Sequence, residues 1–378
     1  MQKFSVNQFV KVERKDQKEA WPLSRSGHRS VAGENNFWVF GGYNPEIISD
    51  DLQSEDNLLR ELWSFNVTTN TWKLIPPDRN MPDKVASHAV FRHGDQMLVF
   101  GGTGFPFGAS SSNDLYVCHL PSGQWKVIEC KGSIPESVYG QAITVIDSDL
   151  YTYGGTTGLV YNTDLHKLDL HNFTWKKIKP NNSIDELPPE RYRHEIAVYA
   201  GKIFVLGGGT SHRVYRMTHV HVYCTRSNKW SAELTKWDKI TKKFPWSRRC
   251  HSCVQHHDKA FICGGYDGVA VHTDLWQLHL PHLQWSKIAV LPEPLYFHSA
   301  AITTEGCMLV FGGTTEIRSM KRTDSCYRIW LAVPSLQTLC WHTLIETRPH
   351  LLSMTKQQLL TLGISEHFIK KLPCADGA

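Results

Sequence analysis

A pair of adjacent glycines follows a short apolar run six times in this chain of 378 residues. The pairs are Gly41-Gly42, Gly101-Gly102, Gly154-Gly155, Gly207-Gly208, Gly264-Gly265 and Gly312-Gly313. A repeat of about 50 residues indicates that each copy is one supersecondary unit and that neighbouring copies stack to bury a shared core. The chain is thereby restricted to architectures built from six similar units.

Other residue types recur at fixed places in the repeat. A histidine precedes five of the glycine pairs, at His28, His88, His194, His251 and His298, and Gln141 takes its place in the third copy. A tryptophan follows five of the pairs, at Trp72, Trp125, Trp175, Trp230 and Trp285, and Leu336 stands where the sixth is due. Turns and alternating strand-like segments between these marks predict four antiparallel strands per copy, which is one blade of a β-propeller. We expect the glycines at a crowded bend and the tryptophans between neighbouring blades.

The fold class predicted is therefore all-β, a six-bladed β-propeller over residues 21–333. A short helical segment over residues 334–373 and a free tail over residues 374–378 are expected to follow. The sixth copy lacks its last strand, which would leave an open sheet edge. Residues 1–20 contain Phe9-Val10-Lys11-Val12, which we expect to supply this strand from the N-terminus.

The period of the apolar residues changes after Trp330. One helix face carries Leu336, Leu339, Cys340 and Leu344. The predicted helix begins after Pro334-Ser335 and ends at Pro349. Thr355 with Gln358 predicts a capping box for a second helix that stops at Gly363, and Ser365 begins a short third one. Two roles stay open for these helices: packing on the underside of the propeller, or docking of a partner.

The repeat pattern resembles the kelch family over roughly residues 20–333, and residues 335–344 resemble an elongin-binding box. The combination is similar to kelch-domain substrate receptors of cullin-2 ubiquitin ligases. The resemblance implies that Leu336, Cys340 and Leu344 bind elongin C of the elongin B/C pair, and that Pro349 and Leu352 face cullin-2 with its RING subunit. Arg348 stands where such boxes usually carry an apolar residue, so the choice of cullin stays open.

Two further segments narrow the resemblance to one branch of that family. They are Thr103-Gly104-Phe105-Pro106-Phe107-Gly108 and Arg191-Tyr192-Arg193-His194-Glu195.

Strand alternation places two sets of loop residues on one face of the propeller, near its axis. The set before the histidines holds Arg25, Ser26, Tyr139, Arg191, Tyr192, Arg193, Arg248, Arg249, Tyr296 and Phe297. The set after the glycine pairs holds Tyr43, Thr103, Thr156, Thr157, Thr210, Ser211, Tyr266, Thr314 and Thr315. Arginines among hydroxyls and aromatic rings suit one anionic group, because a guanidinium matches a carboxylate bidentately. The family resemblance implies that this anion is the free C-terminus of a substrate protein that ends in a small residue such as Gly or Ala.

The chain itself ends in Asp376-Gly377-Ala378. We therefore expect that its own tail can enter such a pocket, in itself or in a neighbouring copy, and so support self-association.

Two other function classes compete with a ligase receptor. An enzyme is disfavoured because no catalytic motif stands out, and because five of the twenty histidines recur once per blade, as structural residues do. Cys250-His251-Ser252-Cys253 resembles only half a zinc motif, so we expect no catalytic residue, metal or cofactor. The other alternative is a kelch scaffold that binds an internal motif or a folded partner outside any ligase.

The charge distribution and the length of the apolar runs argue against nucleic-acid and membrane partners. The net charge of +5 is small and dispersed, which does not indicate nucleic acid, and no run reaches the roughly 18 to 20 apolar residues of a membrane span. Met1 to Val10 carries no secretory pattern, and ten cysteines without a framework favour a reducing compartment. We therefore expect the cytoplasm or nucleus and no membrane partner.

Overall fold

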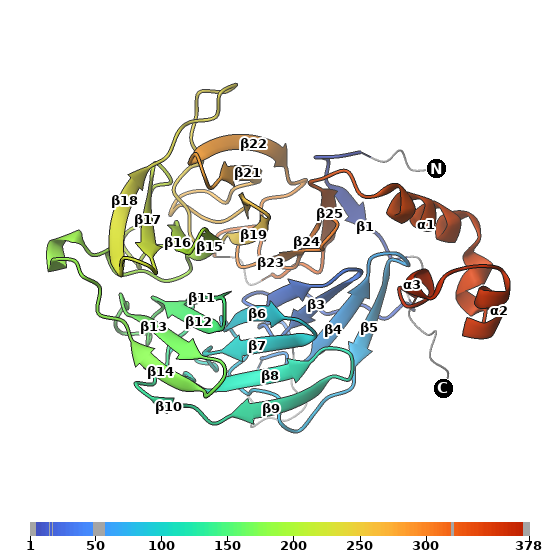
Figure 1. Ribbon diagram of the computed structural model, residues 1–378, viewed down its shortest axis with the longest axis horizontal. Helices are drawn as coiled ribbons and strands as arrows, with labels where there is room; N and C mark the ends of the chain where they lie inside the picture. The colour runs from blue at the N-terminus through green and yellow to red at the C-terminus, as the bar shows by residue number, and fades with distance from the viewer. Residues whose placement is uncertain (1–4, 15, 17, 48–56, 319–320, 373–378) are drawn as a thin grey trace.

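Six sheets surround a common axis, and each contains four antiparallel strands, to which the third sheet adds a short parallel fifth strand (Figure 1). This computed structural model describes residues 5–14, 16, 18–47, 57–318 and 321–372. The predicted tail over residues 374–378 lies outside the described residues. The six-bladed β-propeller predicted from the glycine repeat is confirmed.

Each blade runs from an inner strand near the axis to an outer strand. Blade one contains β2 (Arg29–Ala32), β3 (Asn36–Phe40), β4 (Leu62–Asn66) and β5 (Thr71–Ile75). Blade two contains β6 (Ala89–His93), β7 (Gln96–Phe100), β8 (Leu115–His119) and β9 (Gln124–Ile128). Blade three contains β11 (Ala142–Ile146), β12 (Asp149–Tyr153), β13 (Leu165–Asp169) and β14 (Thr174–Lys177), with β10 (Lys131–Gly132) beside β14. Blade four contains β15 (Glu195–Tyr199), β16 (Lys202–Leu206), β17 (His219–Cys224) and β18 (Lys229–Leu234). Blade five contains β19 (Ser252–His256), β20 (Lys259–Cys263), β21 (Asp274–His279) and β22 (Gln284–Val290). Blade six contains β23 (Ser299–Ile302), β24 (Cys307–Phe311), β25 (Cys326–Trp330) and β1 (Val10–Val12). A short 3-10 helix η1 (Ile184–Glu186) precedes the fourth blade.

The N-terminus supplies the outer strand of the sixth blade. Strand β1 pairs antiparallel with β25, and Val10, Lys11 and Val12 lie opposite Arg328, Tyr327 and Cys326. Val12 is buried in the same core cluster as Phe311 of the sixth blade. The segment expected to close the ring thus pairs with the edge that would otherwise lie open.

The glycine pairs lie where one blade meets the next. Gly41 has φ +73°, and a Cβ built on it would lie 2.5 Å from the carbonyl oxygen of Val85 and 2.9 Å from the ring of His88. Both neighbours belong to the second blade, so the repeated histidine of that blade occupies the space that a side chain at Gly41 would need. The glycine and the histidine are therefore one packing device across the blade boundary.

The repeated tryptophans fill the boundaries between blades. Four of the five pack on the aromatic residue that precedes a glycine pair in the neighbouring blade, and Trp285 instead shares a core cluster with Leu206, which precedes the glycine pair of the fourth blade. The ring centroids are 4.6 Å apart for Phe40–Trp125, 5.1 Å for Phe100–Trp175, 5.0 Å for Tyr153–Trp230 and 5.2 Å for Trp72–Phe311. The expected packing between blades is therefore observed.

After the propeller, the described residues form three α-helices and one 3-10 helix. They are α1 (Leu336–Thr347), η2 (Pro349–Ser353), α2 (Lys356–Thr361) and α3 (Glu366–Ile369). The Ser335 hydroxyl accepts a hydrogen bond from the Thr338 amide, and Thr355 and Gln358 form the predicted capping box. No helix in the described ranges is long and apolar enough to cross a membrane.

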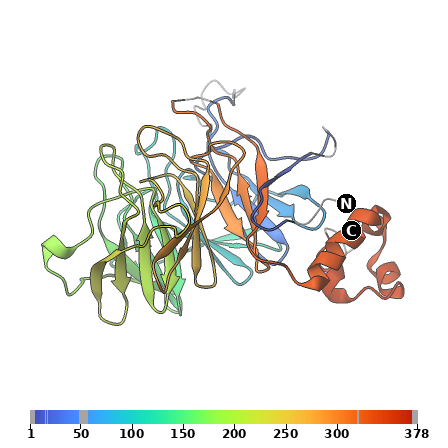
Figure 2. The ribbon, with the colours of Figure 1, turned by 90° about the horizontal axis from the view of Figure 1, so that it is seen from above.

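The helical segment stands to one side of the propeller (Figure 2). It contacts the face opposite the glycine pairs, at the turn that joins β2 to β3. The side-chain amides of Asn35 and Asn66 both donate to the Lys371 carbonyl at 2.8 Å, and the Lys371 ammonium lies 2.8 Å from Glu34. Trp330 of β25 also contacts the ring of His342. The contact with the underside of the propeller therefore exists, and it holds the helices in a fixed position.

Candidate functional site

Six equivalent residues form a closed hydrogen-bonded ring around the propeller axis. Each directly precedes a repeated histidine or Gln141, and each has φ between +55° and +70°. These residues, which we call the axial ring, are Gly27, Ser87, Gly140, Arg193, Cys250 and Phe297. The backbone N–H of each donates to the carbonyl of its counterpart in the preceding blade, at 2.7–3.1 Å. This backbone ring surrounds the axis on the face that carries the glycine pairs.

Arg193 extends across the axial ring. Its guanidinium donates to the Ser87 hydroxyl and lies 4.5 Å above the centre of the Phe297 ring. A Cβ built on Gly27, on the other side of the ring, would lie 3.7 Å from the same guanidinium. Residues of the first, second and sixth blades therefore surround this one side chain from the fourth blade.

The Arg193 guanidinium is a buried cation without a carboxylate partner. The residue is 8% exposed, and burial lowers the pKa of its guanidinium. Its Nε has no hydrogen-bond partner, and in the described part of the chain no acidic side chain forms an ion pair with it, because nearby Glu195 pairs with Arg29 at 2.6 Å. Burying a charge without a counterion is costly, so this position favours an anion.

A second layer of side chains surrounds the axial ring. In each blade, the residue before the ring member pairs with the residue after the second glycine. The pairs are Ser26–Tyr43, Ala86–Thr103, Tyr139–Thr156, Tyr192–Gly209, Arg249–Tyr266 and Tyr296–Thr314. We call the axial ring and these pairs the axial basin.

The axial basin is aromatic and basic over blades three to six and into blade one. The Arg249 guanidinium lies 5.8 Å from the Tyr192 ring and 5.7 Å from the Tyr266 ring. Arg322 lies over Tyr43, on the opposite side, at 5.7 Å. Aromatic faces favour cations, so these rings help to hold the guanidiniums around the axis.

Three of the arginines predicted to contact a ligand lie inside their own blades. Arg25, Arg191 and Arg248 are equivalent, and each donates to the carbonyl of the first glycine of its blade, at 3.1, 3.1 and 2.8 Å. Arg25 also pairs with Glu61 at 2.7 Å, Arg248 pairs with Asp274 at 2.7 Å, and Arg191 donates to the His221 ring at 3.3 Å. All three are buried and their guanidiniums are occupied within the blade.

The other predicted ligand residues divide into two groups. The structure brings Tyr139, Tyr192, Arg193, Arg249, Tyr266 and Tyr296 together in the axial basin. Ser211 is an exposed residue of the loop between β16 and β17.

Sequence reasoning missed Ser87 and Arg322, whose side chains form hydrogen bonds in this region. Ser87 directly precedes a repeated histidine, so an alignment of the six copies by their histidines would have placed it in the axial ring. Arg322 donates to the Ser26 hydroxyl at 2.7 Å from an irregular loop of the sixth blade, where no repeated residue marks its position. Only the folded chain brings Arg322 to the axis.

The repeated histidines are buried structural residues. His28 hydrogen-bonds the Phe311 carbonyl of the sixth blade at 3.0 Å, and His88 hydrogen-bonds the Val85 carbonyl at 3.0 Å. Burial lowers the pKa of His88 and of His298 to about 3, so both rings are neutral near pH 7. Over the residues that the structure places, no three His, Cys, Asp or Glu side chains gather as a metal site would require.

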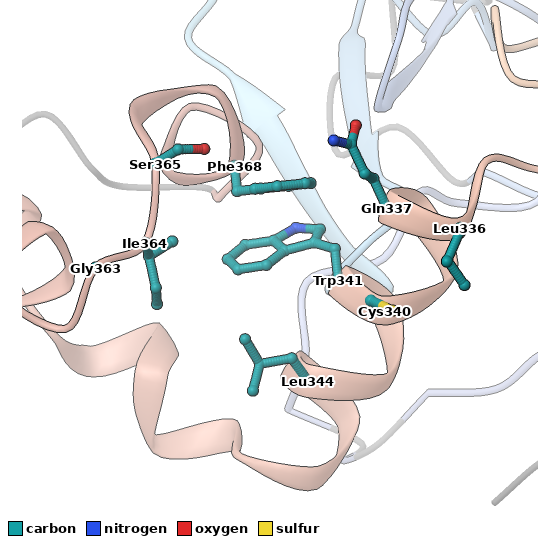
Figure 3. A pocket seen from close by; sticks show the side chains of 9 residues that line it. All are labelled: Leu336, Gln337, Cys340, Trp341, Leu344, Gly363, Ile364, Ser365 and Phe368. Atoms are coloured by element: carbon teal, nitrogen blue, oxygen red, sulfur yellow. The ribbon is translucent and has the colours of Figure 1, made fainter.

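A second candidate site is an apolar groove of about 470 Å³ on the helical segment. Figure 3 shows Leu336, Cys340 and Leu344 along α1, with Ile364 and Phe368 across the groove. Leu336 is 75% exposed, and Leu344 and Cys340 are exposed as well. The predicted elongin-binding residues thus share one open surface. Pro349 and Leu352, predicted to face cullin-2, are also exposed.

The helix that carries the groove is anchored by residues next to the exposed stripe, and one of them, Trp341, also lines the groove. Trp341 and Ile345 of α1 are buried against Leu351, Leu359 and Ile369 in a separate core. The Trp341 ring stacks on Phe368 at 5.0 Å. This core fixes α1 while its apolar side stays open.

Comparison with known proteins places the chain in a family. The family model described as the KLHDC2/KLHL20/DRC7 Kelch-repeats domain matches residues 3–208 and 183–363. Kelch domain-containing protein 10 of Xenopus tropicalis is 48% identical over 354 residues, which cover 93% of this chain and 86% of that protein. The human protein of the same name is 47% identical over 357 residues, covering 93% of this chain and 80% of its own length. The Drosophila melanogaster homolog is 38% identical over 404 residues, 99% of this chain and 66% of its own length. The chain therefore belongs to the KLHDC2/KLHL20/DRC7 kelch-repeat family and is similar over most of its length to kelch domain-containing protein 10.

Proposed function

We propose that this chain is the substrate-recognition subunit of a cullin-RING ubiquitin ligase, and that its axial basin captures the free C-terminal carboxylate of substrate proteins. The observation that carries the proposal is the Arg193 guanidinium, which is buried on the axis without a carboxylate partner among the described residues. A ligand carboxylate supplies the missing counterion and accepts hydrogen bonds from Arg193. The chain then acts as a binding module and performs no catalysis itself.

The shape of the axial basin favours a small terminal residue. Two of the six ring members are Gly27 and Gly140, whereas Phe297 and Tyr192 crowd the approach to Arg193. A terminal Gly or Ala lets the carboxylate reach the guanidinium before its own side chain meets these rings. Neutral tyrosine hydroxyls and Arg249 surround the next residues of the peptide.

The apolar groove supports the ligase part of the proposal. Leu336 would enter a pocket of elongin C, Cys340 would allow close approach, and Leu344 would extend the apolar stripe. Since α1 is already folded and anchored, docking would cost little ordering entropy. Pro349 and Leu352 would face cullin-2, downstream of the same helix.

The first experiment measures the binding of matched peptides to the purified 378-residue chain. One series ends in Gly or Ala with a free carboxylate, and the other carries the same residues as C-terminal amides. We expect binding that is lost on amidation, measured by fluorescence anisotropy or calorimetry. Equal binding of both series, or none, would instead support a kelch scaffold that reads an internal motif or a folded partner.

A second experiment tests the groove independently of the axial basin. Leu336→Asp places a charge in the groove and should abolish co-purification with elongins B and C. Leu362→Asp is the matched control, because Leu362 is 58% exposed on the same segment but does not line the groove. Loss of elongin binding in both variants, or in neither, contradicts the assignment of the groove.

A further inference from the structure

The connector between β18 and β19 carries a group of exposed apolar side chains. Ile240 is 90% exposed at the turn, and Trp237 and Trp246 are 54% and 69% exposed. In Figure 1 this connector extends outward from the ring, beside β18. Its backbone also runs along the outer strand of the fifth blade, where the Lys236 amide donates to the Leu283 carbonyl at 2.7 Å and the Trp285 amide donates back to Lys236 at 2.9 Å. The group therefore lies on the rim of the propeller.

The same connector is rich in lysine and its acidic residue is already used. Lys236, Lys239, Lys242 and Lys243 are all exposed. The lysine ion pairs of the described residues are at other positions of the chain, so these four ammonium groups have no acidic partner there. Asp238 is buried, and its carboxylate accepts from the Thr241 amide and hydroxyl, both at 2.7 Å.

The connector is preformed. The Asp238 amide donates to the Lys243 carbonyl at 2.9 Å, and the Lys242 amide donates back to the Asp238 carbonyl at 2.8 Å. These bonds and the Asp238 carboxylate hold the turn so that Ile240 projects at its tip. A partner would therefore meet an ordered apolar tip within a cluster of lysines, at little cost in loop ordering.

We propose that residues 236–246 form a peripheral docking surface for an anionic lipid bilayer. Ile240 would enter the acyl boundary, the two tryptophans would lie at the headgroup level, where amphipathic rings are favoured, and the lysines would contact anionic headgroups.

The side-chain types favour lipid over the two other anionic partners. Lysine is depleted in protein–protein interfaces, whereas it is common where proteins meet anionic membranes. Single-stranded nucleic acid stacks on flat rings, and the aliphatic tip at Ile240 would have no partner there. From the sequence alone we expect no membrane partner because no apolar run is long enough to span a bilayer, but peripheral docking through an exposed connector needs no such run.

The test uses the full-length chain and vesicles of phosphatidylcholine with or without phosphatidylserine. We expect co-sedimentation only with the anionic vesicles, weakened by salt, and a blue shift of tryptophan fluorescence on binding. The triple variant Lys239→Glu, Lys242→Glu, Lys243→Glu should bind on the order of a hundredfold more weakly, since each basic residue near such a surface contributes a factor of about five. Ile240→Ser should weaken binding about tenfold through lost apolar burial.

A charge-matched control is Lys126→Glu, Lys131→Glu, Lys176→Glu, which alters three exposed lysines on other blades. Its binding to anionic vesicles should stay within a few-fold of the parent chain, and all variants should keep the parent unfolding temperature. Equal binding to both vesicle types, or equal loss in the connector and control variants, overturns the proposal. Binding to polyglutamate but not to vesicles also overturns it and assigns the connector to an acidic protein.

Discussion

Arginines that look alike in the sequence have opposite environments in the fold. Arg25, Arg191 and Arg248 donate to backbone carbonyls inside their blades, and two of them pair with carboxylates. Arg193, two residues after Arg191, lies across the axis without a carboxylate among the described residues. We expect the first kind to contribute to stability and propose the second as the one that meets a ligand.

This difference can be tested with a pair of methionine substitutions. Arg248→Met leaves Asp274 buried without its partner, so we expect a loss of about 3–5 kcal/mol in the free energy of unfolding. Arg193→Met removes a buried unpaired charge, so stability should hold or rise, while affinity for a carboxylate peptide should fall by about 1.5–3 kcal/mol. Urea unfolding and peptide titration measure the two effects. Equal destabilisation by both variants would contradict the distinction.

The buried histidines predict how stability depends on pH. The pKa of His88 and of His298 is about 3 in the folded chain, and about 6.5 when unfolded. The unfolded chain therefore binds more protons between these values, so stability is complete above about pH 6.5 and falls as the pH drops towards about 3. At about pH 5.5, each histidine should therefore have lowered the free energy of unfolding by about 1.4 kcal/mol.

Gln141 provides the matched variant, because it occupies the histidine position of the third blade and donates to the Phe100 carbonyl. His298→Gln should lower the loss of unfolding free energy between about pH 7.5 and 5.5 by about 1.4 kcal/mol. An unchanged loss would show that His298 does not titrate in this way.

Two kinds of element have different roles in this protein. The inner strands and their loops place the axial ring, and the ring geometry depends on the close contact of each repeated histidine with a neighbouring glycine. Helix α1 instead packs through Trp341 and Ile345 on a small core of its own, and its exposed stripe of Leu336, Cys340 and Leu344 lines the groove. The two candidate sites are therefore supported by separate cores.

Separate cores predict local rather than global effects of a change at Trp341. Trp341→Ala should destabilise the helical segment by about 3–5 kcal/mol, because a buried ring that stacks on Phe368 is lost. Hydrogen exchange should increase in residues 336–372, and peptide binding to the axial basin should persist. Uniform loss of protection across the blades would contradict this independence.

At the scale of the whole molecule, the propeller depends on contacts between distant parts of the chain. Strand β1 closes the sixth blade by pairing with β25. Across the axis, Arg29 of the first blade pairs with Glu195 of the fourth at 2.6 Å and donates to the His88 carbonyl of the second. Ring closure by β1 and these contacts of Arg29 hold the inner strands around the axis.

Ring closure can be tested with two neighbouring positions of β1. Val12 is buried in the core of the sixth blade, whereas Lys11 is exposed. Val12→Asp should destabilise the whole propeller by several kcal/mol, because it buries an unpaired charge, and should promote association through the freed edge of β25. Lys11→Asp is the control and should change stability by less than about 0.5 kcal/mol. Unfolding curves and light scattering distinguish the two, and similar behaviour of both variants would contradict the role of β1.

The sequence by itself determined the number of blades, their strands and the helix ends. It could do so because these features depend on local, repeated chemistry: glycines at a bend with positive φ, tryptophans in phase, and caps such as Ser335 and Thr355. The apolar stripe of Leu336, Cys340 and Leu344 could also be predicted from the sequence, because the helix period alone places these residues on one face.

Only the tertiary structure decided which arginines can meet a ligand. Arg191 and Arg193 differ by two positions in the chain, but one points into its blade and the other crosses the axis to Ser87. Arg322 reaches the axial basin from an irregular loop of the sixth blade and donates to Ser26, near the axis in the first blade. Each of these outcomes depends on contacts between residues that no local pattern relates, and such contacts arise only when the six blades close around the axis.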